Sequence, residues 1–245
     1  MMPLFHTGGI VRNVLAPVMS GGSAVMCSGF DPVAFWILSA KFKATWYVFI
    51  FTCRRVPEYW NRYYAAPTMH HTILASQPDS DVSSRDIHIR MICNAAGGLM
   101  PSLAARLKDK FSNAVILPSY GMTESVYLSA CGCITSHSIN RCMPITSPPT
   151  NYQLDRPGCS GIACGPHLSI RDPTDIGRQL SYGTIGAICV RGIPTFEGYE
   201  ISPDISVPLD KSVFSPEGWF DSGDVGYMDT DGWGLPGSRN REPAV

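Results

Sequence analysis

The sequence predicts an α/β fold, with a partial doubly wound βαβ sheet followed by a smaller, β-rich and barrel-like subdomain. Short apolar runs alternate with helix-forming segments in the front half, as is typical of parallel βαβ units. From about Gly158 onward, short strand-like runs are separated by Gly, Pro and Asp, and no convincing helix is expected. We expect one subdomain over residues 1–157 and a second over 158–233, within a chain of 245 residues.

Each element of the front half follows from a local signal. Asp31 followed by Pro32 is a favourable helix start, a capping side chain before a proline in the first turn, and this helix should run to about Lys41. Leucines at four-residue spacing give a later helix one apolar face. The expected strands are Ser23–Cys27, Ala44–Tyr47, His88–Cys93 and Ala114–Leu117, and the other helices are Pro67–Ala75 and Pro101–Phe111.

The back half is expected to be built from short strands alone. The runs that predict them are Leu168–Arg171, Ile185–Arg191, Trp219–Phe220 and Val225–Met228. The Gly, Pro and Asp residues between these runs favour turns. This pattern favours a small barrel or an irregular β-domain.

Composition excludes several classes of partner. The net charge is −1 and charged residues are 16% of the chain, so nothing attracts a nucleic acid or an anionic membrane surface. No apolar run approaches the roughly 20 residues of a membrane-spanning helix. The nine cysteines show no recurring C-x-x-C pair at zinc spacing, and we interpret them as reduced intracellular thiols.

The most informative segment is Ser119–Ser125, with the sequence S-Y-G-M-T-E-S. It follows an expected buried strand, which places it at the carboxyl edge of a sheet, where open α/β sheets bind ligands. Thr123 offers a hydroxyl and Glu124 a carboxylate, and this pair suits a phosphate group and its Mg²⁺. The alternative is an ordinary helix cap at the end of a strand.

A second motif, about a hundred residues later, makes the first one much more specific. Gly218–Asp231 reads G-W-F-D-S-G-D-V-G-Y-M-D-T-D. With Y-G-M-T-E, it resembles the adenylate-forming (AMP-binding) enzymes, and most of all the acyl-CoA synthetases. Other segments fit in the same order along the chain, from about Pro3 to Trp233: Pro3–Gly9 (P-L-F-H-T-G-G), Ile92–Gly98 (I-C-N-A-A-G-G) and Gly186–Tyr199 (G-A-I-C-V-R-G, then F-E-G-Y).

The resemblance implies ATP-dependent activation of a carboxylic acid as an acyl-adenylate, followed by transfer to coenzyme A. ATP, Mg²⁺ and coenzyme A are therefore the expected cofactors. The catalytic residues it implies are Thr123, which would contact a phosphate oxygen, Glu124, which would hold the metal, and His6. The cofactor-binding residues it implies are Asn94, Ala95, Ala96 and Gly97 around the base, Tyr120 stacked on adenine, Gly121, Met122, Asp224 on the ribose hydroxyls, and Arg239 of the hinge.

Several of these residues have simpler explanations. Asp224 could be a turn residue and Asn94 could cap a loop. Asp221, Asp229 and Asp231 could indicate calcium, but the glycine-and-glutamate frame of a calcium loop is missing.

His6 stands where the related α-amino-acid enzymes carry an aspartate that pairs with the substrate ammonium. Burying an ammonium without such a partner is costly, so an acyl, aryl or small dicarboxylic acid is expected instead. The alternative is a histidine that merely packs near a helix start.

Two stretches depart from the family pattern, at residues 48–64 and 125–141. Neither has a clear periodicity. One hypothesis is that both are translated non-coding sequence, such as retained introns. The other is that they are lineage-specific surface loops, which cost little conformational entropy.

The chain is expected to cover about the middle half of an adenylate-forming enzyme. From the resemblance, we expect the phosphate loop normally upstream and the C-terminal lysine domain to be missing, and 234–245 to be an aberrant, truncated hinge. The expected partner is a small-molecule carboxylic acid, with no nucleic acid and no membrane span, in the cytoplasm or peroxisome. Two alternatives remain: an adenylation unit that loads a carrier protein, and a non-catalytic fragment.

We predict that residues 1–245 alone form no measurable acyl-CoA. Losing one preorganised charge-stabilising group commonly costs 10²–10³ in rate, and several are expected to be missing. The measurement is chromatographic detection of acyl-CoA with the Glu124→Ala variant as control. Product above that control would contradict the prediction.

Overall fold

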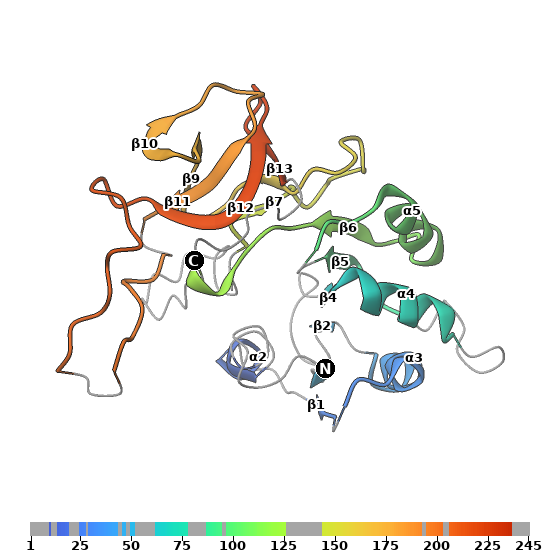
Figure 1. Ribbon diagram of the computed structural model, residues 1–245. Helices are drawn as coiled ribbons and strands as arrows, with labels where there is room; N and C mark the ends of the chain where they lie inside the picture. Colours follow the sequence, from blue (N-terminus) through green and yellow to red (C-terminus); the bar gives the residue numbers. More distant parts are fainter. Residues whose placement is uncertain are drawn as a thin grey trace. The chain divides into compact units, whose positions relative to one another are not determined.

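The computed structural model describes residues 10, 14–19, 25–27, 29–43, 46–47, 50–51, 62–77, 87–94, 97–125, 144–192, 195–202 and 206–236. The chain forms two compact units, each described here by itself (Figure 1). The first comprises Met1–Ser119, Leu128–Cys142 and Pro148–Gly158, and the second comprises Tyr120–Tyr127, Met143–Ser147 and Cys159–Val245.

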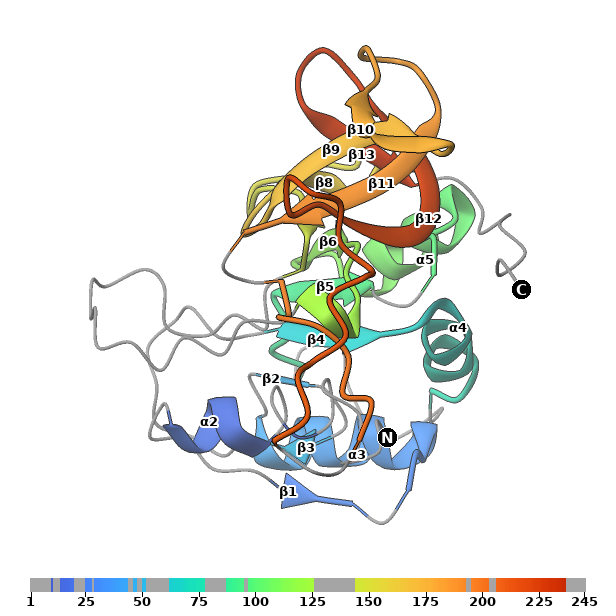
Figure 2. The same cartoon turned by 60° about the vertical axis from the view of Figure 1, so that its left-hand side comes forward.

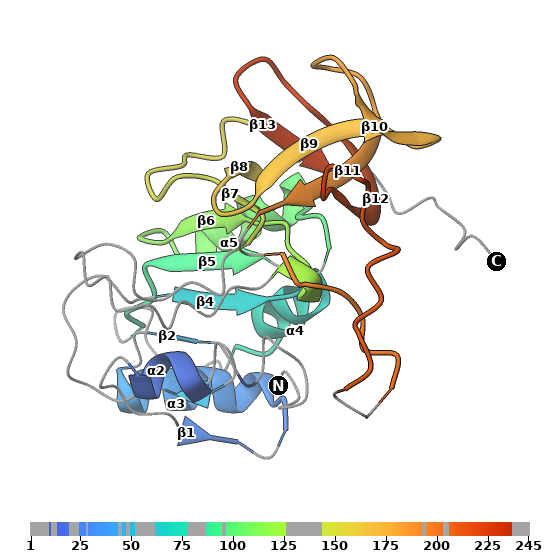
Figure 3. The same ribbon diagram turned by 90° about the vertical axis from the view of Figure 1, so that its left-hand side faces the viewer.

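A six-stranded sheet in the order β1-β3-β2-β4-β5-β6 forms the centre of the first unit. Its strands are β1 (Val25–Met26), β2 (Trp46–Tyr47), β3 (Ile50–Phe51), β4 (Arg62–Ala65), β5 (Met91–Asn94) and β6 (Val115–Pro118). Strands β2, β4, β5 and β6 pair in parallel, and Figure 3 shows β4, β5 and β6 side by side. This confirms the expected parallel βαβ arrangement.

The helices of this unit are α2 (Ala16–Met19), α3 (Pro32–Phe42), α4 (Pro67–Ala75) and α5 (Pro101–Lys110). Helix α3 begins as predicted, because Asp31 Oδ1 accepts hydrogen bonds from the amides of Val33 and Ala34 at 2.9 and 3.0 Å. Helices α4 and α5 are the crossovers of the β4-α4-β5-α5-β6 sequence.

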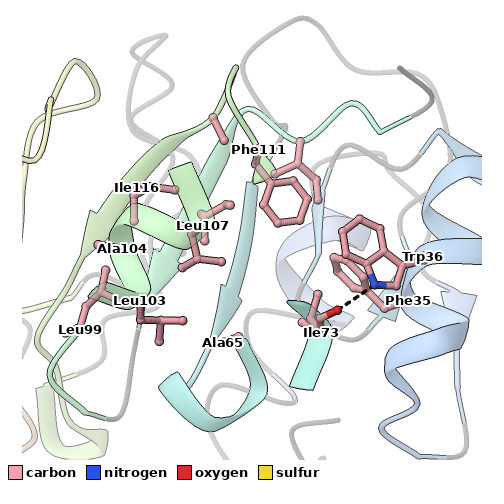
Figure 4. Packing of buried hydrophobic residues seen from close by; sticks show 13 residues of the cluster. Phe35, Trp36, Ala65, Ile73, Leu99, Leu103, Ala104, Leu107, Phe111 and Ile116 are labelled. Carbon is pink, nitrogen blue, oxygen red and sulfur yellow. Dashed lines mark hydrogen bonds between the residues drawn. The ribbon is translucent and has the colours of Figure 1, made fainter. Parts of the chain in front are cut away.

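Buried apolar side chains from α3, α4 and α5 pack against β5 and β6 (Figure 4). Leu103 and Leu107 of α5 are fully buried, as their four-residue spacing predicts. Trp36 of α3 stacks on Phe111 with ring centroids 5.5 Å apart, and its indole Nε1 donates to the carbonyl of Ile73 at 2.9 Å. The indole therefore links three helical segments through one buried side chain.

The structure adds a strand that the sequence analysis did not assign. Arg62, Tyr63 and Tyr64, at the end of the stretch 48–64, form β4 together with Ala65. Two consecutive tyrosines have a high β-propensity, and here they lie between two parallel neighbours. The stretch 125–141 lies outside the described residues apart from Ser125.

The second unit contains a seven-stranded sheet in the order β10-β9-β11-β12-β13-β8-β7, and all its pairs are antiparallel. Its strands are β7 (Thr146–Ser147), β8 (Gly161–Ala163), β9 (His167–Asp172), β10 (Asp175–Gln179), β11 (Gly186–Arg191), β12 (Phe220–Met228) and β13 (Trp233–Pro236). Among the described residues, the outer strands β10 and β7 do not pair with one another, so the sheet is open. The expectation of a barrel-like subdomain was therefore wrong, because the sheet does not close on itself.

The expectation of two short strands, Trp219–Phe220 and Val225–Met228, was wrong in one respect: the structure has a single nine-residue strand, β12. The Ser and Gly residues between the two runs suggested a break. Instead the pairing with β11 shifts register between Ala187 and Cys189, so a local irregularity takes up the difference. The strand thus continues through Asp224.

The structure confirms the α/β class: a mainly parallel sheet with crossover helices in one unit and an antiparallel sheet in the other. Within the described part of the second unit, the helical element is η3, a short 3₁₀ turn at Thr123–Ser125. None of the described helices is long and apolar enough to cross a membrane.

His70 gives the first unit a predicted sensitivity to acid. Its side chain is fully buried in α4, and this burial lowers the pKa of the imidazole from 6.5 to about 4. The unfolded chain therefore binds a proton that the folded chain excludes, and stability falls as the pH drops below 6.5 toward 4.

We predict that stability falls by about 2 kcal/mol between pH 7.5 and 5 because of His70. His70→Gln should be less stable at pH 7.5 but should lose most of this pH dependence, as measured by urea unfolding. His88→Gln, which changes an exposed histidine, is the matched control and should keep the original profile. An unchanged slope in His70→Gln would contradict the prediction.

Candidate functional site

The predicted site residues divide into three groups. Tyr120, Gly121, Met122, Thr123, Glu124 and Asp224 lie in the second unit, and Asn94 and Gly97 lie in the first. His6, Ala95, Ala96 and Arg239 lie outside the described residues.

The turn after β6 is fixed by backbone pairing and by apolar packing. Tyr120 forms an antiparallel bridge with Thr146, in which each amide donates to the other residue's carbonyl at 3.1 Å. The side chains of Tyr120 and Met122 pack against the cluster of Ile145, Val190 and Phe220. The next residues can therefore present polar groups from a well-held backbone.

Tyr120 and Asp224, 104 positions apart in the chain, meet within this unit. The phenol of Tyr120 donates a hydrogen bond to Asp224 Oδ2 at 2.8 Å. Asp224 is 9% exposed, and its amide also donates to the hydroxyl of Ser222 at 3.2 Å. The two residues that the motifs assign to a nucleoside are thus neighbours in space.

Glu124 is held through both its backbone and its side chain. Its carbonyl accepts from the amide of Phe196 at 2.8 Å, and its Oε1 accepts from the phenol of Tyr199 at 3.0 Å. Partial burial and then the hydrogen bond and charge of Glu124 raise the pKa of Tyr199 above 10.0, so the phenol remains a donor at neutral pH. No other hydrogen bond of this carboxylate occurs within the described part of the chain.

Tyr199 is the site residue that the sequence analysis missed. The F-E-G-Y segment that contains it was recognised only as part of a family motif, with no role attached. Only its position in that motif could have marked Tyr199 as a site residue, because neither spacing nor periodicity in the sequence connects it to Glu124.

The two hydroxyl residues beside Glu124 differ in exposure. Thr123 is exposed, and its hydroxyl has no hydrogen-bond partner among the described residues. Ser125 is fully buried, and its Oγ also has no hydrogen-bond partner among the described residues. The exposed hydroxyl of Thr123 and the Oε2 atom of Glu124 are therefore the groups on this turn that can reach a ligand.

Asn94, the last residue of β5, bonds to Gly97. Asn94 Nδ2 donates to the carbonyl of Gly97 at 2.5 Å, while Asn94 Oδ1 is buried without a hydrogen-bond partner in the described ranges. Gly97 has φ +149°, a conformation that residues with a side chain rarely adopt. The end of β5 therefore carries a buried acceptor, Asn94 Oδ1, that the described residues do not satisfy.

Asp221 and Asp229, two of the aspartates considered for calcium, accept hydrogen bonds from amides within their own turns. Asp229 Oδ1 accepts from the amides of Asp231 and Trp233, and Asp221 Oδ1 accepts from the amide of Gly223, each at 2.9 Å. Over the described residues, no group of three or more His, Cys, Asp or Glu side chains could hold a metal ion. A cation here would need oxygen atoms from its own ligand as well as from Glu124.

Comparison with known proteins gives consistent results. Residues 1–200 match the family model described as "AMP-binding enzyme". The chain is 28% identical to an oxalate–CoA ligase of Arabidopsis thaliana over 95% of this chain and 38% of that protein. It is also 28% identical to a sulfoacetate–CoA ligase of Cupriavidus necator, over 98% of this chain and 39% of that protein.

The fold also matches that of solved structures. The O-succinylbenzoate coenzyme A synthetase of Bacillus subtilis, in complex with ATP and magnesium ion, superposes with a TM-score of 0.67 at 19% identity. The match covers 96% of this chain and 40% of that chain. The chain thus spans about two fifths of the length of the proteins it resembles.

We predict that Tyr120 and Asp224 are energetically coupled. Tyr120→Phe and Asp224→Asn should each destabilise the chain, and the double variant should lose about 1 kcal/mol less than the sum of the two. The measurement is a double-mutant cycle by urea unfolding. Tyr152 is the control, because its phenol donates to the carbonyl of Arg156 and not to Asp224. The effects of Tyr152→Phe and Asp224→Asn on stability should therefore add. If the effects of Tyr120→Phe and Asp224→Asn also add, the coupling is contradicted.

Proposed function

Because the chain belongs to the AMP-binding enzyme family, we propose that it takes part in ATP-dependent activation of a carboxylic acid, as an acyl-adenylate, and in transfer of the acyl group to coenzyme A. The observation that carries this proposal is the pairing of Tyr120 with Asp224 at 2.8 Å, beside a turn that presents Thr123 and Glu124.

Asp224 and Tyr120 would bind the nucleoside. An ionised carboxylate only accepts hydrogen bonds, which suits the two donor hydroxyls of a ribose, and the phenol of Tyr120 orients this carboxylate. The bond between them also fixes the Tyr120 ring, which would stack on the adenine.

Glu124 and Thr123 would face the phosphates. Mg²⁺ is commonly held by one or two carboxylates together with phosphate oxygens and water, so a single carboxylate with one engaged oxygen fits this ion. When bound, the ion would neutralise phosphate charge and so favour approach of a second anion. The exposed hydroxyl of Thr123 would donate to a phosphate oxygen.

The reaction proposed has two displacement steps. A carboxylate oxygen of the acid attacks the α-phosphorus of ATP, and pyrophosphate leaves. The thiol of coenzyme A then attacks the acyl carbon, and AMP leaves. The residues described here would bind and orient the nucleotide, which makes the first attack effectively intramolecular.

The proposed acceptor and substrate follow from the named relatives. Two of the relatives are CoA ligases for oxalate and sulfoacetate, both small acids with two anionic groups. We therefore propose that the substrate is a small acid and that His6 lies near its carboxylate. We propose coenzyme A as the acceptor of the acyl group, because these relatives are CoA ligases. An intracellular setting, cytoplasmic or peroxisomal, belongs to the same proposal.

We predict that Asp224 recognises the ribose hydroxyls. Asp224→Asn should lower the affinity for ATP about ten- to a hundredfold, because a charge-assisted hydrogen bond is worth roughly 1.5–3 kcal/mol. The measurement is equilibrium dialysis with Mg²⁺-ATP and with Mg²⁺-2′,3′-dideoxy-ATP. The unchanged chain should prefer ATP, and Asp224→Asn should bind both nucleotides equally weakly.

Asp231→Asn, which removes a charge from an exposed turn, is the matched control and should retain the preference. Absence of ATP binding by the unchanged chain, or equal affinity for both nucleotides, would contradict the proposed function.

A further inference from the structure

Residues 195–202 and 206–214 form two adjacent arms (Figure 2), and the first of them bonds to Glu124. Tyr199 on the outgoing arm forms an antiparallel bridge with Asp210 on the returning arm, with hydrogen bonds of 3.0 and 2.8 Å. At the base, Phe196 packs its ring on Phe214 and Phe220, with centroids 5.4 and 5.0 Å away. The arms are therefore anchored in the apolar core of the second unit.

Local geometry places the Tyr199 ring. Gly198 has φ +143°, and a Cβ atom there would lie 2.5 Å from the carbonyl oxygen of Asp210, so glycine is required. The Tyr199 ring then meets Phe196 edge-on at 4.7 Å. These constraints set the direction in which the phenol points, which is toward Glu124.

From this geometry we propose that Tyr199 is a positioning residue for Glu124. Its phenol holds Oε1, so that Oε2 is left in a fixed direction for the divalent cation that accompanies the nucleotide. The inference rests on the proposed function, because it assumes that Glu124 meets this cation. Tyr199 itself touches neither nucleotide nor metal in this proposal.

A positioning role differs measurably from a structural one. A tyrosine that only stabilised the fold would weaken metal-free and metal-bound nucleotide alike when changed. A tyrosine that orients the carboxylate should affect only the part of the affinity that depends on the cation. The diagnostic quantity is therefore the ratio of the affinity for Mn²⁺-ATP to that for ATP in EDTA.

We expect Tyr199→Phe to lower this ratio about three- to tenfold, with the affinity for metal-free ATP unchanged. A charge-assisted hydrogen bond is stronger than a neutral one, but 41% of Tyr199 is exposed to solvent, which weakens the bond. We therefore expect a modest factor. Binding is measured on the 245-residue chain by equilibrium dialysis, and bound Mn²⁺ by electron paramagnetic resonance. Tyr182→Phe, at an exposed tyrosine of the same unit, is the control and should leave the ratio unchanged.

A second measurement tests the hydrogen bond without any nucleotide. In a chain labelled with ¹³Cζ-tyrosine at pH 7, the Tyr199 signal, identified by its loss in Tyr199→Phe, should move in Glu124→Gln. It should stay in place in Glu197→Gln, which removes an exposed charge two residues from Tyr199. A signal that does not respond to Glu124→Gln would overturn the proposal.

The outcomes separate the two claims. One outcome is that Glu124→Gln loses the preference for Mn²⁺-ATP over metal-free ATP while Tyr199→Phe keeps it. The positioning proposal is then overturned and the proposed function stands. If the unchanged chain binds Mn²⁺-ATP no better than metal-free ATP, the metal role of Glu124 is wrong and the positioning proposal is overturned with it.

Discussion

The hydrogen bond from the Tyr120 phenol to the Asp224 carboxylate is the interaction on which the candidate site depends. It joins the turn after β6 to the middle of β12, two segments separated by 104 positions in the sequence. The bridge of Tyr120 to Thr146 and the packing of Tyr120 and Met122 against the apolar cluster hold the first of these segments in place. Without these supports, a ring and a carboxylate on distant segments would have no common orientation, and neither could select a nucleoside.

The same turn then presents Glu124, and a second set of contacts restrains it. The amide of Phe196 and the phenol of Tyr199 both bond to this one residue, one to its backbone and one to its side chain. Charge placed in advance costs no reorganisation when a charged ligand binds, which is the general advantage of such restraint. The site thus combines the pair that we propose to bind a nucleoside with a restrained carboxylate, and both are built on the antiparallel sheet of one unit.

The sequence was a good guide wherever the signal was local. The Asp31–Pro32 cap marked the start of α3, Pro67 marked α4, and the leucine spacing of α5 identified its buried face. The sequence was a poor guide where the pairing of strands sets the length of an element. Gly223 suggested a break between two strands, but β12 runs through it because its register with β11 shifts. The motifs likewise indicated Tyr120, Glu124 and Asp224, but not Tyr199, since its contact with Glu124 depends on two arms whose pairing has no short-range pattern.

Photoaffinity labelling with 8-azido-ATP, with mass spectrometry of the labelled residues, tests the central claim most directly. The account predicts that label appears within Tyr120–Met122, that excess ATP prevents it, and that it is strongly reduced in the Asp224→Asn variant. Labelling elsewhere in the chain, or labelling that ATP does not compete, would contradict the assignment of this turn and Asp224 to a nucleotide.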